Sequence, residues 1–227
     1  MSTLTAKRSM ITHLDPNSQA SDAFRTLRNM MGAQDDAWQV LTVISAAPSE
    51  GRTTVAANLA LAYAQTGKKV LLIDGCTKQP ALDRVFSLSN LRGLTNVLRQ
   101  TATLGEAVQP AAGLPTLSVL TAGPTPSLTD DLLDTAAMES LLTQAKEQFD
   151  LILIDSPAML ALADAATLSR KSDGVLWVLH TGISRKAKAL EMKKLLQRLN
   201  VRIIGCVLNK AERKMTRAYR HYVTSRG

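Results

Sequence analysis

Short apolar runs alternate with amphipathic segments along most of this chain. The apolar runs have the length of buried β-strands and are rich in Val, Ile and Leu: 40–44, 69–74, 117–120, 149–155, 174–180 and 201–208. The amphipathic segments space their apolar residues as helices do: 22–31, 55–64, 130–148 and 184–199. Strands that alternate with helices predict an α/β fold, built as a doubly wound and mostly parallel sheet.

The length of 227 residues is enough for one such domain with a sizeable core. We expect residues 1–20 to form a mobile N-terminal arm, 21–210 the α/β domain and 211–227 a basic tail that contains tyrosines. The two cysteines, Cys76 and Cys206, do not suggest a disulfide framework. No apolar run approaches the roughly 18–20 residues of a membrane span, and no signal-peptide pattern opens the chain. These features predict a cytoplasmic protein.

The positive charge of the chain is concentrated toward its C-terminus. The formal net charge is +8, and residues 182–227 hold 13 lysines and arginines but two acidic residues. Such a bias occurs in nucleic-acid-binding proteins, but this segment has no recognisable nucleic-acid motif. A solvated helix face beside an anionic membrane surface or an acidic partner fits the pattern equally well. Nucleic acid is therefore not the partner we expect.

The strand at 40–44 leads directly into the pattern of a phosphate-binding loop. Such loops follow [GA]-x-x-x-x-G-K-[ST] between a strand and a helix, and the fixed positions are taken by Ala46, Gly51, Arg52 and Thr53. The backbone N–H groups of such a loop form a concave anion site, and the Ser or Thr hydroxyl binds Mg²⁺. A lysine normally reaches the phosphates. Arg52 keeps the charge but is planar and bulkier, so the exchange is not conservative.

Two of the predicted strands end in a carboxylate, namely Asp74 and Asp155. The carboxyl ends of parallel strands open onto the ligand crevice of a doubly wound sheet. Both side chains should therefore face the Mg²⁺ that Thr53 would bind. The loop and the two strand ends together favour nucleotide binding over a plain polar turn.

Further motifs extend the argument over nearly the whole chain, from about residue 11 to residue 222. The matched segments are 48–54 (P-G-E-G-K-[ST]-T), 71–80 (L-L-I-D-x-D-x-R-x-P), 149–157 (F-D-x-I-I-I-D-[TS]-P) and, with Asp in place of Glu, Asp22, Arg25 and Arg28 (E-x-x-R-x-x-R). In these motifs the chain resembles the bacterial tyrosine kinases (BY-kinases) of capsule and exopolysaccharide synthesis, in their free-standing cytoplasmic form.

The resemblance implies a P-loop NTPase fold, the cofactors ATP and Mg²⁺, and transfer of the γ-phosphoryl group to tyrosine. By motif position, the residues that contact nucleotide would be Ser49, Glu50, Gly51, Arg52, Thr53 and Thr54. Those that contact the metal would be Thr53, Asp74 and Asp155, and the catalytic positions would be Arg52, Asp74, Cys76 and Asp155. Asn209, after the last strand, would read the adenine edge. A turn-forming Asn without a ligand is an equally good interpretation.

The resemblance also implies partners. Tyr219 and Tyr222 would accept phosphate, and the stripe of Asp22, Arg25 and Arg28 would dock into a neighbouring subunit of a homo-oligomer. The activator would be the cytoplasmic tail of a membrane polysaccharide co-polymerase, which would hold the chain at the inner face of the membrane. A cognate phosphatase would reverse the modification.

Four positions of one active-site system depart from the family pattern: Ser49 for Gly, Arg52 for Lys, Cys76 for Asp and Lys78 for Arg. A thiol, with a pKa of about 8.5, is mostly neutral at pH 7 and cannot replace a carboxylate near Mg²⁺. The departures predict impaired catalysis. Three functions stay open: a kinase that tolerates these changes, a pseudokinase scaffold, and a partition-type ATPase switch. That last class usually has a lysine near the start of its loop, where this chain has Ala47.

Overall fold

The computed structural model describes residues 10–32, 38–111, 113–125, 131–160 and 163–211. Within these residues, strands join into one sheet in the order β3-β4-β2-β5-β1-β6-β7. Their bounds are β1 Val40–Ile44, β2 Val70–Asp74, β3 Gln109–Ala111, β4 Leu114–Leu120, β5 Leu151–Asp155, β6 Gly174–His180 and β7 Ile203–Asn209. β3 pairs antiparallel with β4, and the other pairings are parallel. The predicted α/β fold with a doubly wound, mostly parallel sheet is confirmed.

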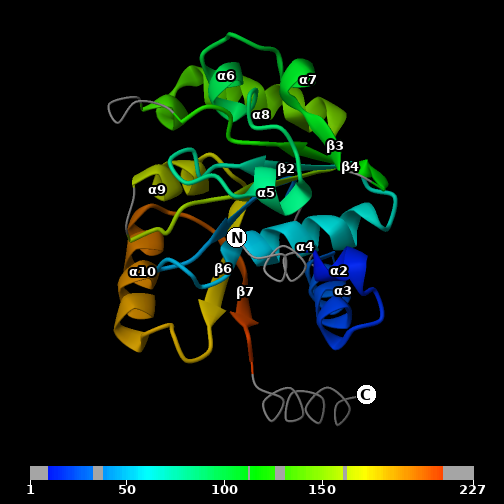
Figure 1. Cartoon of the computed structure of the whole chain (residues 1–227). Helices are drawn as coiled ribbons and strands as arrows, with labels where there is room; N and C mark the ends of the chain where they lie inside the picture. Colours follow the sequence, from blue (N-terminus) through cyan, green and yellow to red (C-terminus); the bar gives the residue numbers. More distant parts are fainter. Residues whose placement is uncertain (1–9, 33–37, 112, 126–130, 161–162, 212–227) are drawn as a thin grey trace.

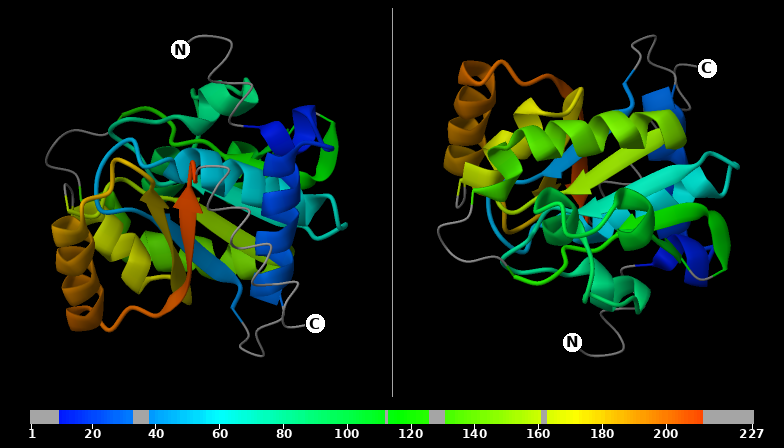
Figure 2. Two further views of the ribbon diagram at one scale, coloured as in Figure 1. Left: turned by 90° about the horizontal axis from the view of Figure 1, so that it is seen from below. Right: turned by 90° about the horizontal axis from the view of Figure 1, so that it is seen from above.

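Helices cover both faces of this sheet (Figure 1 and Figure 2). On one face lie α4 Arg52–Ala64 and α5 Leu82–Phe86, with α2 Ile11–Leu14 and α3 Gln19–Gly32 packed against α4. Those on the other face are α6 Leu94–Leu98, α7 Leu104–Ala107, α8 Ala136–Gln148, α9 Ala163–Arg170 and α10 Lys186–Arg198, together with the short 3₁₀ turn η1 Leu132–Asp134. The central strands are buried on both faces, which explains why their sequences are continuously apolar.

The prediction of a mobile N-terminal arm over residues 1–20 is wrong for residues 10–20, because these residues fold onto the domain. Thr12 of α2 is buried, and its N–H donates to Asn58 Oδ1 of α4 over 2.9 Å. The Ser21 hydroxyl of α3 lies 2.6 Å from Asp15 O and 3.1 Å from Ile11 O, which ties α2 to α3. Residues 10–20 therefore belong to the domain, and residues 1–9 lie outside the described residues.

The predicted helix over 130–148 is wrong in its first turn. The structure has η1 over 132–134 and starts α8 at Ala136, because Thr135 between them is extended, with φ −110° and ψ 160°. The short elements α5, α6, α7 and β3 were not predicted, since three to five residues give too short a window for periodicity. The helix α9 was not predicted either.

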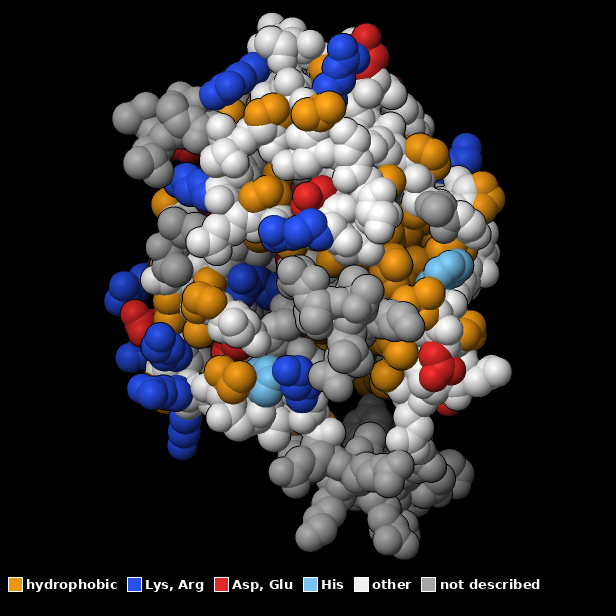
Figure 3. Space-filling model, viewed as in Figure 1, with side chains coloured by type: hydrophobic (Ala, Val, Ile, Leu, Met, Phe, Trp, Pro, Cys, Tyr) orange, Lys and Arg blue, Asp and Glu red, His pale blue; other side chains and the backbone are white. Residues whose placement is uncertain are grey.

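Lysine and arginine side chains gather over α10 (Figure 3). The exposed ones in this helix are Lys186, Lys188, Lys193, Lys194 and Arg198. The same helix buries Met192 and Leu196 against the sheet, so its charged side faces solvent. No helix of the described ranges combines the length and the apolarity that a bilayer crossing requires.

Candidate active site

The carboxyl ends of β1, β2 and β5 meet at one edge of the sheet. β2 and β5 pair in a parallel register that places Asp74 opposite Asp155, and β1 pairs with the other side of β5. The loop that leaves β1 enters α4 at Arg52. The structure therefore brings together the phosphate-type loop and the two strand-end carboxylates.

Two residues of this loop have left-handed backbone conformations. Ser49 has φ 63°, and Gly51 has φ 97°. An L-residue in this region is destabilised by about 1–2 kcal/mol, so Ser49 is strained at the position where the resembled motif has glycine. Gly51 is needed for a second reason. A Cβ at this position would lie 2.0 Å from Asn209 Nδ2.

Glu50 closes the loop and ties it to the neighbouring strand ends. Its side chain is buried, with one carboxylate oxygen accepting from Ala47 N at 3.0 Å and the other from the Ser184 hydroxyl. Asn209 Nδ2 at the end of β7 donates to Glu50 O over 3.0 Å. Asn209 thus lies beside the loop and uses an amide N–H to hold it.

Arg52 spans the gap between the loop and β5. Its Nε donates to Ser156 O at 2.9 Å, and its Nη1 donates to Ala47 O at 2.9 Å and to the Ser45 hydroxyl. The guanidinium is therefore bound by three acceptors of the protein itself. A phosphate that approaches Nε or Nη1 must compete with these acceptors, while Nη2 carries two further N–H groups.

Thr53 and Asp155 form the part of the site that suits a cation. Thr53 Oγ1 donates to Asp155 Oδ2 over 2.6 Å, while Asp155 Oδ1 is buried without a hydrogen-bond partner. Burial, together with the charge of Asp74, raises the pKa of Asp155 to about 7. A hydroxyl and a carboxylate oxygen are the hard donors that Mg²⁺ prefers. The residues present therefore fit a magnesium ion.

Asp74 organises the segment that follows β2. Its carboxylate accepts from the backbone N–H groups of Cys76 at 3.0 Å and of Ala81 and Leu82 at 2.9 Å. Burial raises the pKa of Asp74, and these three N–H groups oppose the shift. The carboxylate thereby holds the start of α5 against the strand end.

Cys76 lies beside both carboxylates. Its Sγ is 3.9 Å from Asp155 O, and burial, with the charges of Asp155 and Asp74, raises the pKa of the thiol. Two residues further on, Lys78 Nζ lies 3.6 Å from Asp164 Oδ2 of α9. Cys76 and Lys78 are the two positions that depart from the aspartate motif. Cys76 lies beside the carboxylates, whereas Lys78 pairs with α9.

The charged stripe on α3 is partly used within the protomer. Arg25 pairs with Asp22 and donates to Pro16 O over 2.8 Å. Arg28 Nη1 donates to Ala62 O near the end of α4 over 2.9 Å, which anchors α3 to that helix. The stripe therefore has a structural role, and docking to a neighbouring subunit stays a prediction.

The predicted phosphate acceptors Tyr219 and Tyr222 lie outside the described residues. The third tyrosine, Tyr63, is 4% exposed and packs edge-on against Trp38. Burial raises the pKa of Tyr63 to about 12. Tyr63 is therefore a core residue.

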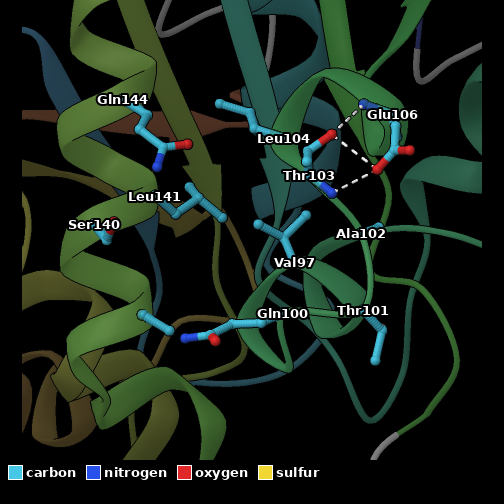
Figure 4. A pocket seen from close by; sticks show the side chains of 11 residues that line it. Val97, Gln100, Thr101, Ala102, Thr103, Leu104, Glu106, Ser140, Leu141 and Gln144 are labelled. Atoms are coloured by element: carbon cyan, nitrogen blue, oxygen red, sulfur yellow. Dashed lines mark hydrogen bonds between the residues drawn. The ribbon is translucent and has the colours of Figure 1, made fainter.

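A pocket of about 430 Å³ lies between α6, α7 and α8 (Figure 4). Val97 and Leu141 point toward one another across it, and Gln100 and Gln144 reach into it from opposite sides. The one carboxylate in its lining, Glu106, accepts from the N–H and the hydroxyl of Thr103 as a helix cap. The pocket uses other elements than the loop, and its lining contains no lysine or arginine.

Sequence reasoning missed the residues that fix the loop from outside. Ser45 and Ser156 bind Arg52, and Ser184 binds Glu50. Ser156 follows directly after Asp155, so its place at the strand end was a usable signal. Nothing in the sequence pointed to Ser184, because its contact with Glu50 joins residues that are 134 positions apart.

The close approach of Asn209 to Gly51 generates a prediction with a matched control. Gly51→Ala and Gly67→Ala place the same methyl group at φ 97° and 87°, but at Gly67 nothing lies within 4 Å. Gly67→Ala should lower the free energy of unfolding by about 1–2 kcal/mol through backbone strain. Gly51→Ala should lower it by about 1 kcal/mol more, because the Asn209 amide must leave Glu50 O.

Urea denaturation measures these energies for six proteins: the parent, Asn209→Ala, and each glycine variant in both backgrounds. In that background the excess cost at Gly51 should vanish. An excess that persists would show that Asn209 is not what constrains Gly51.

Comparisons with known proteins agree with this geometry. A family model described as an AAA domain matches residues 39–201. The tyrosine-protein kinase YwqD of Bacillus subtilis is 35% identical over 220 residues, which make up 96% of this chain and 92% of that one.

Two solved structures resemble the fold closely. The chimerical protein CapA2B2 has a TM-score of 0.85 at 32% identity and covers 90% of this chain and 91% of its own. The kinase domain of the Escherichia coli tyrosine kinase Etk has a TM-score of 0.82 at 29% identity, with 89% of this chain and 81% of that one covered. With its loop, its paired aspartates and its parallel sheet, the chain belongs to the bacterial tyrosine kinase (BY-kinase) family.

Proposed function

We propose that this chain binds Mg·ATP at the loop 45–54 and serves capsule or exopolysaccharide synthesis as a tyrosine kinase with impaired phosphoryl transfer. The observation that carries the nucleotide part is the pair formed by Thr53 and Asp155. Their side chains are 2.6 Å apart, and the second oxygen of Asp155 is buried without a partner at the mouth of a phosphate-type loop. A family membership shared with YwqD supports the tyrosine kinase part.

The residues have distinct roles in this proposal. Backbone N–H groups of Ser49, Glu50, Gly51 and Thr54 and the N-terminus of α4 bind the phosphates. Thr53, Asp155 and Asp74 hold the metal, which when bound neutralises the charge of the β- and γ-phosphates. Asn209 keeps the loop in its bound shape through Glu50 O, and it offers its remaining amide atoms to the adenine edge.

The impairment follows from Arg52 and Cys76. Phosphoryl transfer depends on positioning and on charge around the γ-phosphate. Arg52 gives part of its hydrogen-bonding capacity to Ser45, Ala47 and Ser156. Cys76 places a neutral thiol where the family has a carboxylate, because burial raises the pKa of the thiol. Both changes affect the reacting end of the nucleotide and leave the cradle intact.

The acceptors in this proposal are Tyr219 and Tyr222, since the third of the three tyrosines is buried in the core. Transfer takes place in trans between subunits of a homo-oligomer. The activator is the cytoplasmic tail of a membrane polysaccharide co-polymerase, which places the chain at the inner face of the membrane. A cognate phosphatase removes the phosphate.

A pseudokinase scaffold is the second candidate function. The pairing of Arg52 with protein acceptors favours it, because a guanidinium fixed between two strand ends stabilises the loop without any nucleotide. The scaffold would present its surface to the polysaccharide machinery without transferring phosphate. Binding and phosphorylation measurements separate the two functions.

Nucleotide binding should be present but weakened by Arg52. Arg52→Lys should raise the affinity for Mg·ADP by roughly 5- to 150-fold, about 1–3 kcal/mol, because a lysine is a flexible point charge that releases the three acceptors. Calorimetry measures the change. Arg170→Lys, the same exchange in an exposed ion pair with Asp134, is the control and should leave affinity unchanged. Absence of binding at millimolar nucleotide in both the parent and Arg52→Lys would exclude the nucleotide proposal.

Restoring the family residues should restore transfer. Arg52→Lys combined with Cys76→Asp should raise tyrosine phosphorylation by more than the two single changes together, because both act on the same γ-phosphate and metal. Anti-phosphotyrosine blotting in the presence of the activator tail measures it, with Cys206→Asp as the matched cysteine control. Strong phosphorylation by the unchanged chain would contradict the impairment.

Assembly should depend on α3. Arg25→Ala should reduce concentration-dependent oligomers while leaving stability nearly unchanged, because Arg25 makes mainly exposed contacts. Arg28→Ala should reduce them too, and should also lower the free energy of unfolding by about 1 kcal/mol through the lost bond to Ala62 O. Light scattering with the activator tail supplied measures the assembly, and Arg198→Ala on α10 is the control. A single monomeric species for the parent and both variants would remove this part of the proposal.

A further inference from the structure

Three potential metal ligands converge beside the phosphate loop, and one of them is a thiol. A carboxylate oxygen of Asp74, the Sγ of Cys76 and a carboxylate oxygen of Asp155 all lie within 4.8 Å of one another. In a tetrahedral zinc site with bonds of about 2.0–2.3 Å, ligand atoms lie about 3.3–3.8 Å apart. Since the present separations are at most 4.8 Å, each pair of ligand atoms needs to close by no more than about 1–1.5 Å to share one ion.

A second observation points to a cation at this place. Asp155 is fully buried, and its Oδ1 has no hydrogen-bond partner, although its Oδ2 accepts from Thr53. A buried carboxylate oxygen without a partner is unfavourable, since it has given up its hydrogen bonds to water. The nearby cation Arg52 does not pair with Oδ1, since its N–H groups donate to Ser156 O, Ala47 O and the Ser45 hydroxyl. A metal ion would satisfy Oδ1.

The scaffold around the three ligands is rigid enough to be a site. The parallel register of β2 and β5 fixes Asp74 opposite Asp155. Asp74 is held by the N–H groups of Cys76, Ala81 and Leu82, and the first of these also sets the position of the Cys76 backbone. The ligands come from two adjacent strand ends, so their separation is set by the sheet and does not depend on a long loop.

The chemistry of the donor set selects the class of metal. Mg²⁺ binds oxygen ligands and has little affinity for sulfur, whereas thiolate ligands favour Zn²⁺ and similar ions. Two carboxylates and one thiolate leave the fourth position of a tetrahedral zinc site open to water or to a phosphate oxygen. Replacing the family's aspartate by Cys76 therefore does more than remove a charge. It changes which ion the edge of the sheet prefers.

We propose that Asp74, Cys76 and Asp155 bind one divalent cation of the zinc class in the absence of nucleotide. On binding, the Cys76 thiol gives its proton to solvent and the thiolate ligates the metal. This site differs from the magnesium site of the proposed function, because it uses the thiolate and requires neither Thr53 nor a phosphate. The two sites share Asp74 and Asp155, so they exclude one another.

The test is a Co²⁺ titration of the full chain without nucleotide, followed by the near-ultraviolet charge-transfer band of a thiolate–Co²⁺ bond. The parent and Cys206→Ser should show the band with one Co²⁺ per chain, and Zn²⁺ should abolish it by displacement. Cys76→Ser should lose the band and bind Co²⁺ at least 10-fold more weakly, and Asp155→Asn should also bind more weakly. Because nucleotide is absent, failure of the nucleotide proposal would leave this result unchanged.

A band that is absent from the parent, or that persists in Cys76→Ser, would overturn the proposal. Urea denaturation establishes that Cys76→Ser is folded. If it is not, alkylation of the unmodified chain replaces the variant: Zn²⁺ should slow alkylation of Cys76 and leave that of Cys206 unchanged, as read by mass spectrometry. Equal rates at Cys76 with and without Zn²⁺ would overturn the proposal as well.

Discussion

The parallel pairing of β2 with β5 buries two carboxylates next to each other, and the organisation of the site follows from that pairing. Removing a carboxylate from water is unfavourable by several kcal/mol, while a hydrogen bond to a charged group returns about 1.5–3 kcal/mol. Asp74 has three backbone N–H donors and is compensated by the protein. Asp155 has the Thr53 hydroxyl and the nearby charge of Arg52, and one of its oxygens has no partner. Asp155 is therefore the carboxylate with an unpaired oxygen left for a metal, and Asp74 is the carboxylate that also holds the start of α5.

The two unusual residues act on the same edge in different ways. Arg52 binds the end of β1 and the end of β5 through Ala47 O and Ser156 O, so it stabilises the loop in the absence of ligand. Cys76 leaves the backbone geometry of the aspartate motif in place, since its N–H still donates to Asp74. The family's fold is therefore maintained, while the charged groups at this edge of the sheet differ from the family pattern. We propose that the extent of catalysis depends on these two side chains.

The sequence predicted the centre of the sheet well, because buried parallel strands are continuously apolar and five to seven residues long. It also predicted that Asp74 and Asp155 would meet, because both residues end strands. It could not predict the Ser184 partner of Glu50, since that contact joins the loop to a residue 134 positions away. The prediction of a mobile N-terminal arm was wrong for residues 10–20 for a related reason. α2 is a four-residue helix that is stabilised by its contact with Asn58 and not by its own sequence.

A crystal structure grown with Mg·ADP is the most direct test of the proposal that the loop 45–54 and Asp155 form a nucleotide and metal site. In that structure we expect the phosphates of ADP on the loop backbone, the metal against Thr53 Oγ1 and Asp155, and the Arg52 guanidinium moved off Ser156 O. ADP bound elsewhere, for example between α6, α7 and α8, with Arg52 still on Ser156 O and Ala47 O, would contradict it.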